Sequence, residues 1–478
     1  MTKPLFTFLL IVGAALSFGA ERPNILFIAV DDLRPELGTY GAAVHTPNLD
    51  ALAASGIRFD RAYCNQAVCG ASRLSLMGGL YPTKTGEQTF HVTDWRKRHP
   101  DLLTLNQHFK ANGYLTLGTG KIYHGSNGGE IEKHNWDDWL TSGGKGYVLE
   151  ESLAEMKKNQ AANPDKDPKD FRATTTECAD VPDDAYNDGA RALVAAAKLE
   201  ELVAQEQPFF FAVGFLKPHL PFNAPKRYWD LYERDDFALP ENLSWPSGYP
   251  DYARNRTAGE MSKYSDYEGK SPVDFSDELN KRLMHGYAAC VSYVDANVGH
   301  ILEVLDASPA AENTIVVFWG DHGWKLGDHS SWCKHTNFEV DTRVPLLMRV
   351  PGKETGATEA LVEFIDLYPT LCELAGLEVP RHVQGKSLVP LLEDLKHDHR
   401  TSAYSSYPHG VRMGHSIRMG DYRYTEWWDN NDKFETAVLT DLEADPGEES
   451  NVISDEAHAS AYKAAKEELA ERVAHAIE

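Results

Sequence analysis

Short apolar runs alternate with amphipathic segments along most of this chain of 478 residues. Four continuous apolar runs predict strands that are covered on both faces, at residues 24–30, 114–118, 208–214 and 313–319. Helical spacing recurs between these runs, at residues 49–56, 102–112 and 281–306. Strands that alternate with helices predict an α/β fold with a large, mainly parallel sheet sandwiched by helices.

The pattern changes beyond a charged run near residue 395. Residues 403–442 alternate between apolar and polar positions, which predicts strands, and residues 454–477 have the spacing of an amphipathic helix. We therefore expect a small antiparallel sheet packed by a closing helix. A chain of this length usually exceeds one core, so we predict an α/β domain over 21–395 and a small C-terminal subdomain over 396–478.

Two long stretches are rich in residues that favour loops, at 125–180 and 220–275. Loops of this length in a compact domain usually line or cover a site. We therefore expect both stretches to lie near the functional centre.

The N-terminus has the pattern of a secretory signal. Lys3 precedes an apolar run over residues 5–16, and small residues follow it as far as Ala20. This pattern predicts a signal peptide over 1–20 and export to a periplasm or to the medium. The run is too short for a membrane span, so we expect no membrane partner.

Charge narrows the range of partners. The chain has 72 acidic and 47 basic residues, and its formal charge is -25. This balance argues against nucleic acid and against an anionic membrane surface. Any site for an anion must therefore be a local concentration of Lys, Arg and His.

Acidic residues follow two of the predicted strands. Asp31 and Asp32 follow the run over 24–30, and Asp321 and His322 follow the run over 313–319. Parallel strands present their carboxyl ends at one edge of a sheet, so these side chains are expected to converge. Such carboxylates repel unless a cation neutralises them, and oxygen ligands suit Ca²⁺ or Mg²⁺. The alternative is that the acids cap the helices that follow.

Basic residues follow three of the predicted strands. The pairs Lys121 with His124 and Lys217 with His219 come after two of the runs, and Lys334 lies a little beyond Asp321. Each residue taken alone suits an ordinary surface position. Together, in so acidic a chain, they predict a clamp for an anion.

Cys69 and Arg73 stand four residues apart where a polar loop turns into a predicted helix. Residues at this spacing share a helix face, and a helix N-terminus suits a sulfate or phosphate. The alternative is a buried structural cysteine beside a surface arginine. The surrounding motif is Cys-x-Ala-x-Arg, the signature at which a cysteine is oxidised to formylglycine.

These motifs together resemble the formylglycine-dependent (type I) sulfatases of the alkaline-phosphatase superfamily, and most closely the iduronate-2-sulfatase group. The resemblance extends over nearly the whole chain, and its matching segments are residues 30–35, 66–73, 120–124, 217–222, 320–327, 414–418 and 421–425. It implies the alkaline-phosphatase-like fold of that family. Gly70-Ala71 departs from the Ala-Pro of the human-type enzymes at the same place.

The resemblance also implies residue roles. One Ca²⁺ would be bound by Asp31, Asp32, Asp321 and His322 with the modified Cys69. The remaining catalytic residues would be Arg73, Lys121, His124, His219 and Lys334, and substrate would be bound by Lys217, His219 and Lys334. A separate formylglycine-generating enzyme would mature Cys69, and a hydroxyl of the hydrated aldehyde would attack sulfur. The substrate would be a sulfated saccharide fragment of a glycosaminoglycan or an algal polysaccharide, and the enzyme would be exo-acting.

Two alternatives remain at this stage. A phosphatase or phosphodiesterase of the same superfamily would need a Ser or Thr nucleophile and two zinc ions, which the Cys69 motif disfavours. An exported protein that binds sulfated glycans, with Cys69 never matured, is compatible with the sequence.

Overall fold

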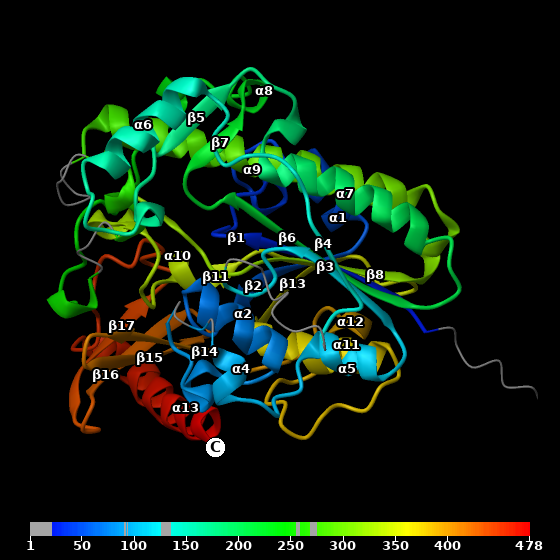
Figure 1. Cartoon of the computed structure of the whole chain (residues 1–478). Helices are drawn as coiled ribbons and strands as arrows, with labels where there is room; N and C mark the ends of the chain where they lie inside the picture. The colour runs from blue at the N-terminus through cyan, green and yellow to red at the C-terminus, as the bar shows by residue number, and fades with distance from the viewer. Residues whose placement is uncertain (1–21, 90–91, 93, 126–134, 255–258, 268–274) are drawn as a thin grey trace, which may run out of the picture.

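A nine-stranded sheet forms the centre of the molecule (Figure 1). A computed structural model describes residues 22–89, 92, 94–125, 135–254, 259–267 and 275–478. The strands of this sheet are β1 (Asn24–Asp31), β2 (Ile57–Tyr63), β3 (Leu115–Gly120), β4 (Asp138–Leu140), β6 (Phe209–Pro218), β8 (Thr314–Gly320), β11 (Arg343–Val344), β12 (Leu346–Arg349) and β13 (Gly356–Glu363).

The predicted mainly parallel sheet is confirmed. Its order is β11-β2-β12-β8-β1-β6-β3-β4, and β13 pairs with β2. Strand β1 runs parallel to both of its neighbours, β6 and β8, and β3 runs parallel to β4 and β6. Only the pairs that involve β11 and β12 are antiparallel within this described sheet. Strand β1 therefore lies near the middle, with its carboxyl end between two parallel neighbours.

Helices cover both faces of the sheet (Figure 1). Alternate residues of β1 feed two separate cores: Leu26 and Ile28 pack toward one layer of helices, and Ile25 and Phe27 toward the other. This two-sided burial explains why the run over 24–30 is continuously apolar. The first layer contains α1 (Pro47–Ala54), α7 (Asn187–Leu202) and α9 (Asp277–Asp306), and the second contains α2 (Cys69–Gly78), α5 (Leu105–Ala111), α11 (Leu367–Leu374) and α12 (Val389–Glu393).

The predicted helices are present, and capping residues set where two of them begin. Helix α5 begins at Leu105 because Thr104 and Gln107 form a capping box. Helix α9 begins at Asp277 because the Ser276 hydroxyl accepts a hydrogen bond from the Leu279 amide at 3.2 Å.

The stretch over 125–180 is less loop-like than predicted. Residues 150–161 form helix α6 (Glu150–Ala161), whose first turn carries two glutamates that complement the helix dipole. Strand β5 (Thr176–Ala179) pairs in parallel with β7 (Phe222–Pro225), so the two long stretches are joined. The other short elements are α3 (Pro82–Thr85), α4 (Trp95–Arg98), α8 (Lys226–Trp229), β9 (Lys325–Leu326), β10 (Trp332–Cys333) and α10 (Glu339–Thr342).

The predicted C-terminal antiparallel sheet and helix are confirmed. The four strands pair in chain order, and helix α13 (Ala459–Ile477) lies beside them (Figure 1). Ile417, Tyr424 and Leu439 pack with Leu469 of that helix. The division of the chain at residue 395 stays a prediction. The strands are β14 (Ser402–His409), β15 (Arg412–Met419), β16 (Tyr422–Asp429) and β17 (Phe434–Asp441).

The predicted signal peptide over 1–20 lies outside the described residues. Among the helices that are described, none has both the length and the apolar character needed to cross a bilayer.

Asp295 of α9 gives a first testable prediction about stability. It is 2% exposed and accepts hydrogen bonds from the Leu49 amide and the Asn48 side chain, both at 2.8 Å. Burial raises the pKa of Asp295 from 3.8 to about 6. A carboxyl whose pKa is raised on folding stabilises the fold at low pH, and this contribution is lost as pH rises through the folded pKa.

We therefore expect Asp295→Asn to destabilise the protein relative to wild type more at about pH 4 than at about pH 7.5. The change in this difference should reach up to roughly 3 kcal/mol, since each pH unit between the two pKa values contributes about 1.4 kcal/mol. Urea unfolding of both proteins at the two pH values measures it. A difference that does not vary with pH would contradict the prediction.

Candidate active site

Strands β1 and β8 end side by side, and their last residues lead into the acidic motifs. The Asp321 amide donates to Val30 O, and the Asp32 amide donates to Asp321 Oδ1, both at 3.0 Å. These bonds hold Asp31, Asp32, Asp321 and His322 at one edge of the sheet, where all four are fully buried. The convergence predicted from the strand ends is thus present.

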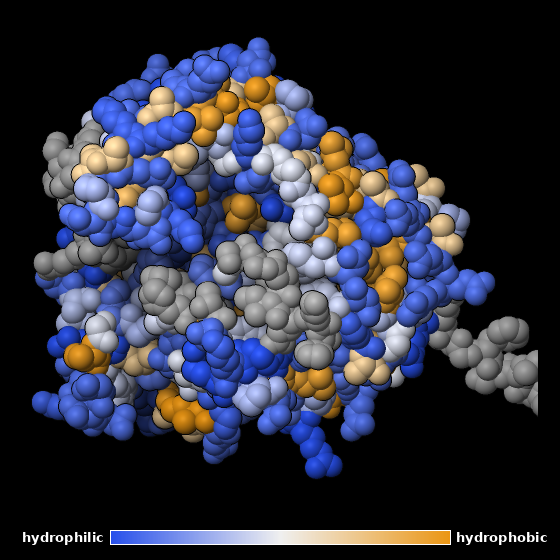
Figure 2. All heavy atoms as spheres, viewed as in Figure 1, coloured by the Kyte–Doolittle hydropathy of each residue, from blue (hydrophilic) through white to orange (hydrophobic). Residues whose placement is uncertain are grey.

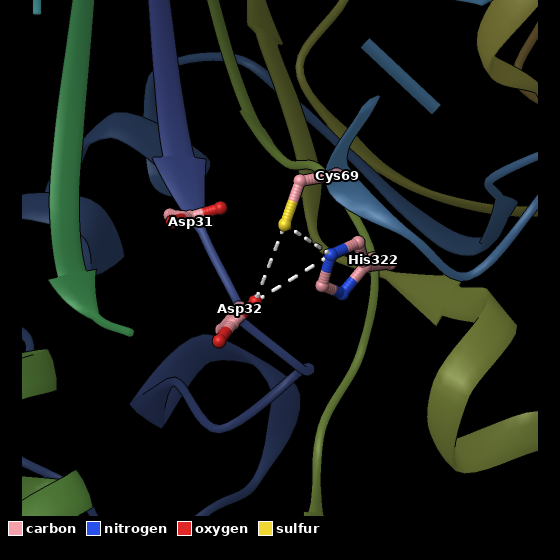
Figure 3. Close-up of side chains that lie close together, drawn as sticks. All are labelled: Asp31, Asp32, Cys69 and His322. Carbon is pink, nitrogen blue, oxygen red and sulfur yellow. Dashed lines mark hydrogen bonds and ion pairs between the residues drawn. The ribbon is translucent and has the colours of Figure 1, made fainter. Parts of the chain in front are cut away.

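The backbone turns sharply at Asp32, whose φ of 59° lies in the left-handed region. Aspartate tolerates this region better than most residues. Helix α9 supports the turn, because Tyr287 Oη donates to Asp32 O at 2.8 Å and accepts from the Arg34 amide at 3.1 Å. The turn brings the Asp32 carboxylate toward Cys69 and His322 (Figure 3).

Cys69 is the first residue of α2, and its thiol points at this acidic edge (Figure 3). Its Sγ lies 3.1 Å from His322 Nε2 and 3.9 Å from Asp32 Oδ1. Side-chain atoms of Asp31, Asp32, Cys69 and His322 that could bind a metal all lie within 4.8 Å of one another. A cysteine at a helix start and two strand ends therefore meet at one point.

Arg73 lies one turn further along α2 and is fully buried. Its Nε lies 2.7 Å from Asp321 Oδ2, and its Nη2 lies 3.4 Å from Asp31 Oδ1. Lys121, after β3, forms an ion pair with Asp31 through its Nζ. Two buried cations thus compensate the acidic edge, as charges removed from water require.

Lys334 and His219 lie near the Asp32 carboxylate. Lys334 Nζ lies 2.8 Å from Asp32 Oδ1, and His219 Nε2 lies 3.9 Å from Asp32 Oδ2. Both also contact Glu260, at 2.9 Å from Lys334 Nζ and 3.1 Å from His219 Nε2. Sequence reasoning did not identify Glu260. The only available signal was its place in the stretch over 220–275 that was expected to line the site.

The pKa values of the two aspartates in the cluster, Asp31 and Asp32, are shifted in opposite directions. Burial would raise the pKa of Asp31, but the charges of Lys121, His219 and Arg73 hold it well below its usual value. Burial prevails at Asp32 and raises its pKa. Burial, with the Asp31 charge, also raises the pKa of the Cys69 thiol well above its usual value. An unmodified Cys69 would therefore stay protonated and be a weak nucleophile.

The donor set fits a hard divalent cation. Asp32 Oδ2 is buried and accepts no hydrogen bond from the described part of the chain. Such an orphaned carboxylate oxygen beside Asp31 suits an oxygen-binding ion. Asp321 lies at the margin of this group, because its Oδ2 bonds Arg73 while its Oδ1 lies 3.6 Å from His322 Nε2.

Among the predicted site residues, Lys217 is bonded to main-chain carbonyl oxygens, and His124 has a strongly lowered pKa. Lys217 Nζ donates to the carbonyl oxygens of His219 and Pro221, at 2.7 and 2.6 Å, and so braces the loop that carries His219. His124 follows Lys121, and burial together with the Lys121 charge lowers its pKa to about 3. His124 is therefore a neutral imidazole near pH 7.

Comparison with known proteins places these features in context. A family model described as "Sulfatase" matches residues 23–377, and one described as "N-sulphoglucosamine sulphohydrolase, C-terminal" matches residues 327–475. Iduronate 2-sulfatase of Mus musculus is 34% identical over 91% of this chain and 91% of its own length. The Homo sapiens protein of that name is 33% identical over 90% and 91%. A solved structure in complex with "its substrate D-Glucosamine-2-N, 6-O-disulfate" has a TM-score of 0.74 and 25% identity, and covers 95% of this chain and 98% of that one.

Proposed function

Because this chain belongs to the sulfatase family, we propose that it is a formylglycine-dependent sulfatase that removes O-sulfate from sulfated sugars. The observation that carries the proposal is the placement of Cys69. Cys69 begins a buried helix, and its thiol lies against Asp32 and His322. Buried lysines pair with the two neighbouring aspartates, Lys121 with Asp31 and Lys334 with Asp32.

The proposed nucleophile is residue 69 after oxidation by a separate formylglycine-generating enzyme. When matured, this residue supplies a hydrated aldehyde, one hydroxyl of which is the nucleophile toward sulfur. The raised pKa of the unmodified thiol supports this proposal, since a protonated thiol would be a weak nucleophile.

The proposed cofactor is one Ca²⁺ per chain. Asp31, Asp32 and His322 would hold it with residue 69, and Asp321 would stand beside them. Such an ion supplies positive charge that lowers the pKa of a bound hydroxyl and stabilises charge on sulfate oxygens.

The surrounding side chains have separable proposed roles. Arg73 and Lys121 hold the Asp31 carboxylate and would stabilise the hydrate and the sulfate. His124, a neutral imidazole, would accept a proton from the hydrate. His219 would donate a proton to the leaving oxygen, and Lys334 beside it would contact that oxygen or the sulfate. Lys217 would contribute to substrate binding by holding the loop that carries His219.

We propose that the substrate is a saccharide with a sulfated uronic acid at its non-reducing end, with 2-O-sulfated iduronate as the leading case. The identity to iduronate 2-sulfatases supports this choice. Local cations would also be needed to bind a sugar carboxylate. The signal-like N-terminus supports a proposal of export to the periplasm or the medium.

The substrate test compares sulfate release from two sets of fragments, with Cys69→Ala protein as the blank. Heparin- and dermatan-derived disaccharides with a terminal 2-O-sulfated uronate form one set, and carrageenan, fucoidan and ulvan fragments form the other. We expect kcat/KM for the first set to exceed that for neutral sulfated galactose or fucose by at least about 10²-fold, because unpaired polar groups reject the wrong sugar. Turnover of only the neutral sugars would overturn the uronate proposal and leave the sulfatase assignment in place.

A further inference from the structure

Glu260 joins the two cationic side chains on the Asp32 side of the site. Its Oε1 lies 2.9 Å from Lys334 Nζ, and its Oε2 lies 3.1 Å from His219 Nε2. We propose that Glu260 is a positioning residue, which holds His219 and Lys334 in the orientation that meets the leaving-group oxygen. This inference rests on the proposed function, and deepens it by assigning a residue outside the expected set.

The turn that carries Glu260 is anchored in the protein interior. The next residue, Met261, is 1% exposed, and Tyr264 is 6% exposed within the larger core. Main-chain hydrogen bonds tie the turn to the segment before β5, from the Arg172 amide to Lys263 O at 2.8 Å and from the Ser265 amide to Ala173 O at 2.9 Å. The Glu260 carboxylate is therefore held in place, unlike a surface charge on a free loop.

His219 needs this second contact to fix its ring. Its Nδ1 lies 2.6 Å from Leu220 O, and a carbonyl oxygen only accepts, so Nδ1 carries a proton. This bond to the neighbouring residue holds only the Nδ1 edge of the ring. Glu260 Oε2 lies 3.1 Å from the opposite nitrogen, Nε2, as an ion pair. This contact favours the ring orientation in which Nε2 also faces Asp32, 3.9 Å from its Oδ2.

Lys334 is held between two carboxylates that come from distant parts of the chain. Its Nζ lies 2.8 Å from Asp32 Oδ1 and 2.9 Å from Glu260 Oε1, and 4.9 Å from the centre of the Trp324 ring. Loss of Glu260 would remove one of these two carboxylates, and with it the contact that ties the position of the ammonium to that of the His219 ring.

The side chain of Glu260 is 27% exposed, whereas that of Lys334 is 1% exposed. Glu260 thus lies on the outer side of the pair and Asp32 on the inner side. Asp32, His219 and Glu260 also offer ligand atoms that lie within 4.8 Å of one another. A positioning role predicts that loss of Glu260 lowers turnover and leaves the calcium content unchanged, so loss of calcium in Glu260→Gln would contradict the inference.

The test is a double-mutant cycle in kcat on the fragment from the substrate panel that wild type turns over fastest. The variants are Glu260→Gln, His219→Gln and the double variant, with Glu241→Gln, an exposed glutamate, as matched control. Formylglycine content, calcium content and thermal midpoint are measured for each protein. Glu260→Asp tests whether a shorter carboxylate restores part of the rate.

We expect Glu260→Gln to lower kcat by about 10²-fold, within the range that a positioned proton donor contributes, with little change in KM or thermal midpoint. The double variant should be no slower than about the slower single variant, because residues that act as one unit are not additive. Glu260→Asp should recover part of the loss, and Glu241→Gln should match wild type.

Additive effects in the cycle, or a fall in kcat that follows a lowered thermal midpoint, would show a structural role and overturn the inference. So would a Glu260→Gln variant as active as wild type. A wild-type enzyme that is fully matured yet releases no sulfate from any fragment would overturn the proposed function first, and this inference with it.

Discussion

Replacing Cys69 by alanine is expected to abolish sulfate release while the protein still folds. The proposed nucleophile is made from this side chain, and removal of a nucleophile from a concerted site costs at least roughly 10⁴-fold in kcat. The substitution removes a single buried sulfur at a helix start, so we expect it to cost only about 1 kcal/mol of stability. Ion chromatography of released sulfate and urea unfolding measure the two effects.

Cys372→Ala is the matched control for Cys69→Ala. Cys372 is also buried, but it lies on α11 in the second core. Its loss should leave turnover unchanged apart from a small loss of stability. Mass spectrometry of the wild-type peptide that contains residue 69, with hydrazide trapping of the aldehyde, should show formylglycine. An unmodified thiol in a fully active preparation would contradict the proposed nucleophile.

The second large effect is expected at Asp32. Asp32→Asn should reduce bound calcium from one ion per chain to near zero and lower kcat by at least about 10²-fold. The change neutralises a carboxylate whose Oδ2 lacks a hydrogen bond within the described residues. It also removes a buried negative charge that lies 2.8 Å from Lys334 Nζ. Elemental analysis after dialysis measures the metal.

Thermal unfolding gives a readout that does not depend on activity. Calcium that binds the folded state raises the unfolding midpoint of wild type by mass action, and this rise should disappear in Asp32→Asn. Asp306→Asn, an exposed carboxylate at the end of α9, should keep both the calcium and the rise. Full calcium retention in Asp32→Asn would contradict the proposed site, and two zinc ions per chain would instead favour the phosphatase alternative.

The sequence alone determined the main helices and strands, and the edge of the sheet at which the site residues gather. Strand β1 follows from a continuous apolar run, because both of its faces are buried. Helix α9 and the C-terminal sheet follow from local periodicity, because a spacing of 3.6 residues or an alternation of two reflects burial directly. The placement of Asp31, Asp32 and His322 at one edge followed from a general rule, since parallel strands present their carboxyl ends together. Cys69 was identified by its motif.

Tertiary structure alone decided which partner each polar side chain of the site contacts. Asp321 bonds Arg73 across 248 residues of chain, and Lys217 turns to carbonyl oxygens, although both belonged to the predicted site. Glu260 enters from a turn that no periodic pattern marks. A charged side chain takes the partner that best offsets its loss of water, and that choice depends on groups brought together by packing across the whole chain.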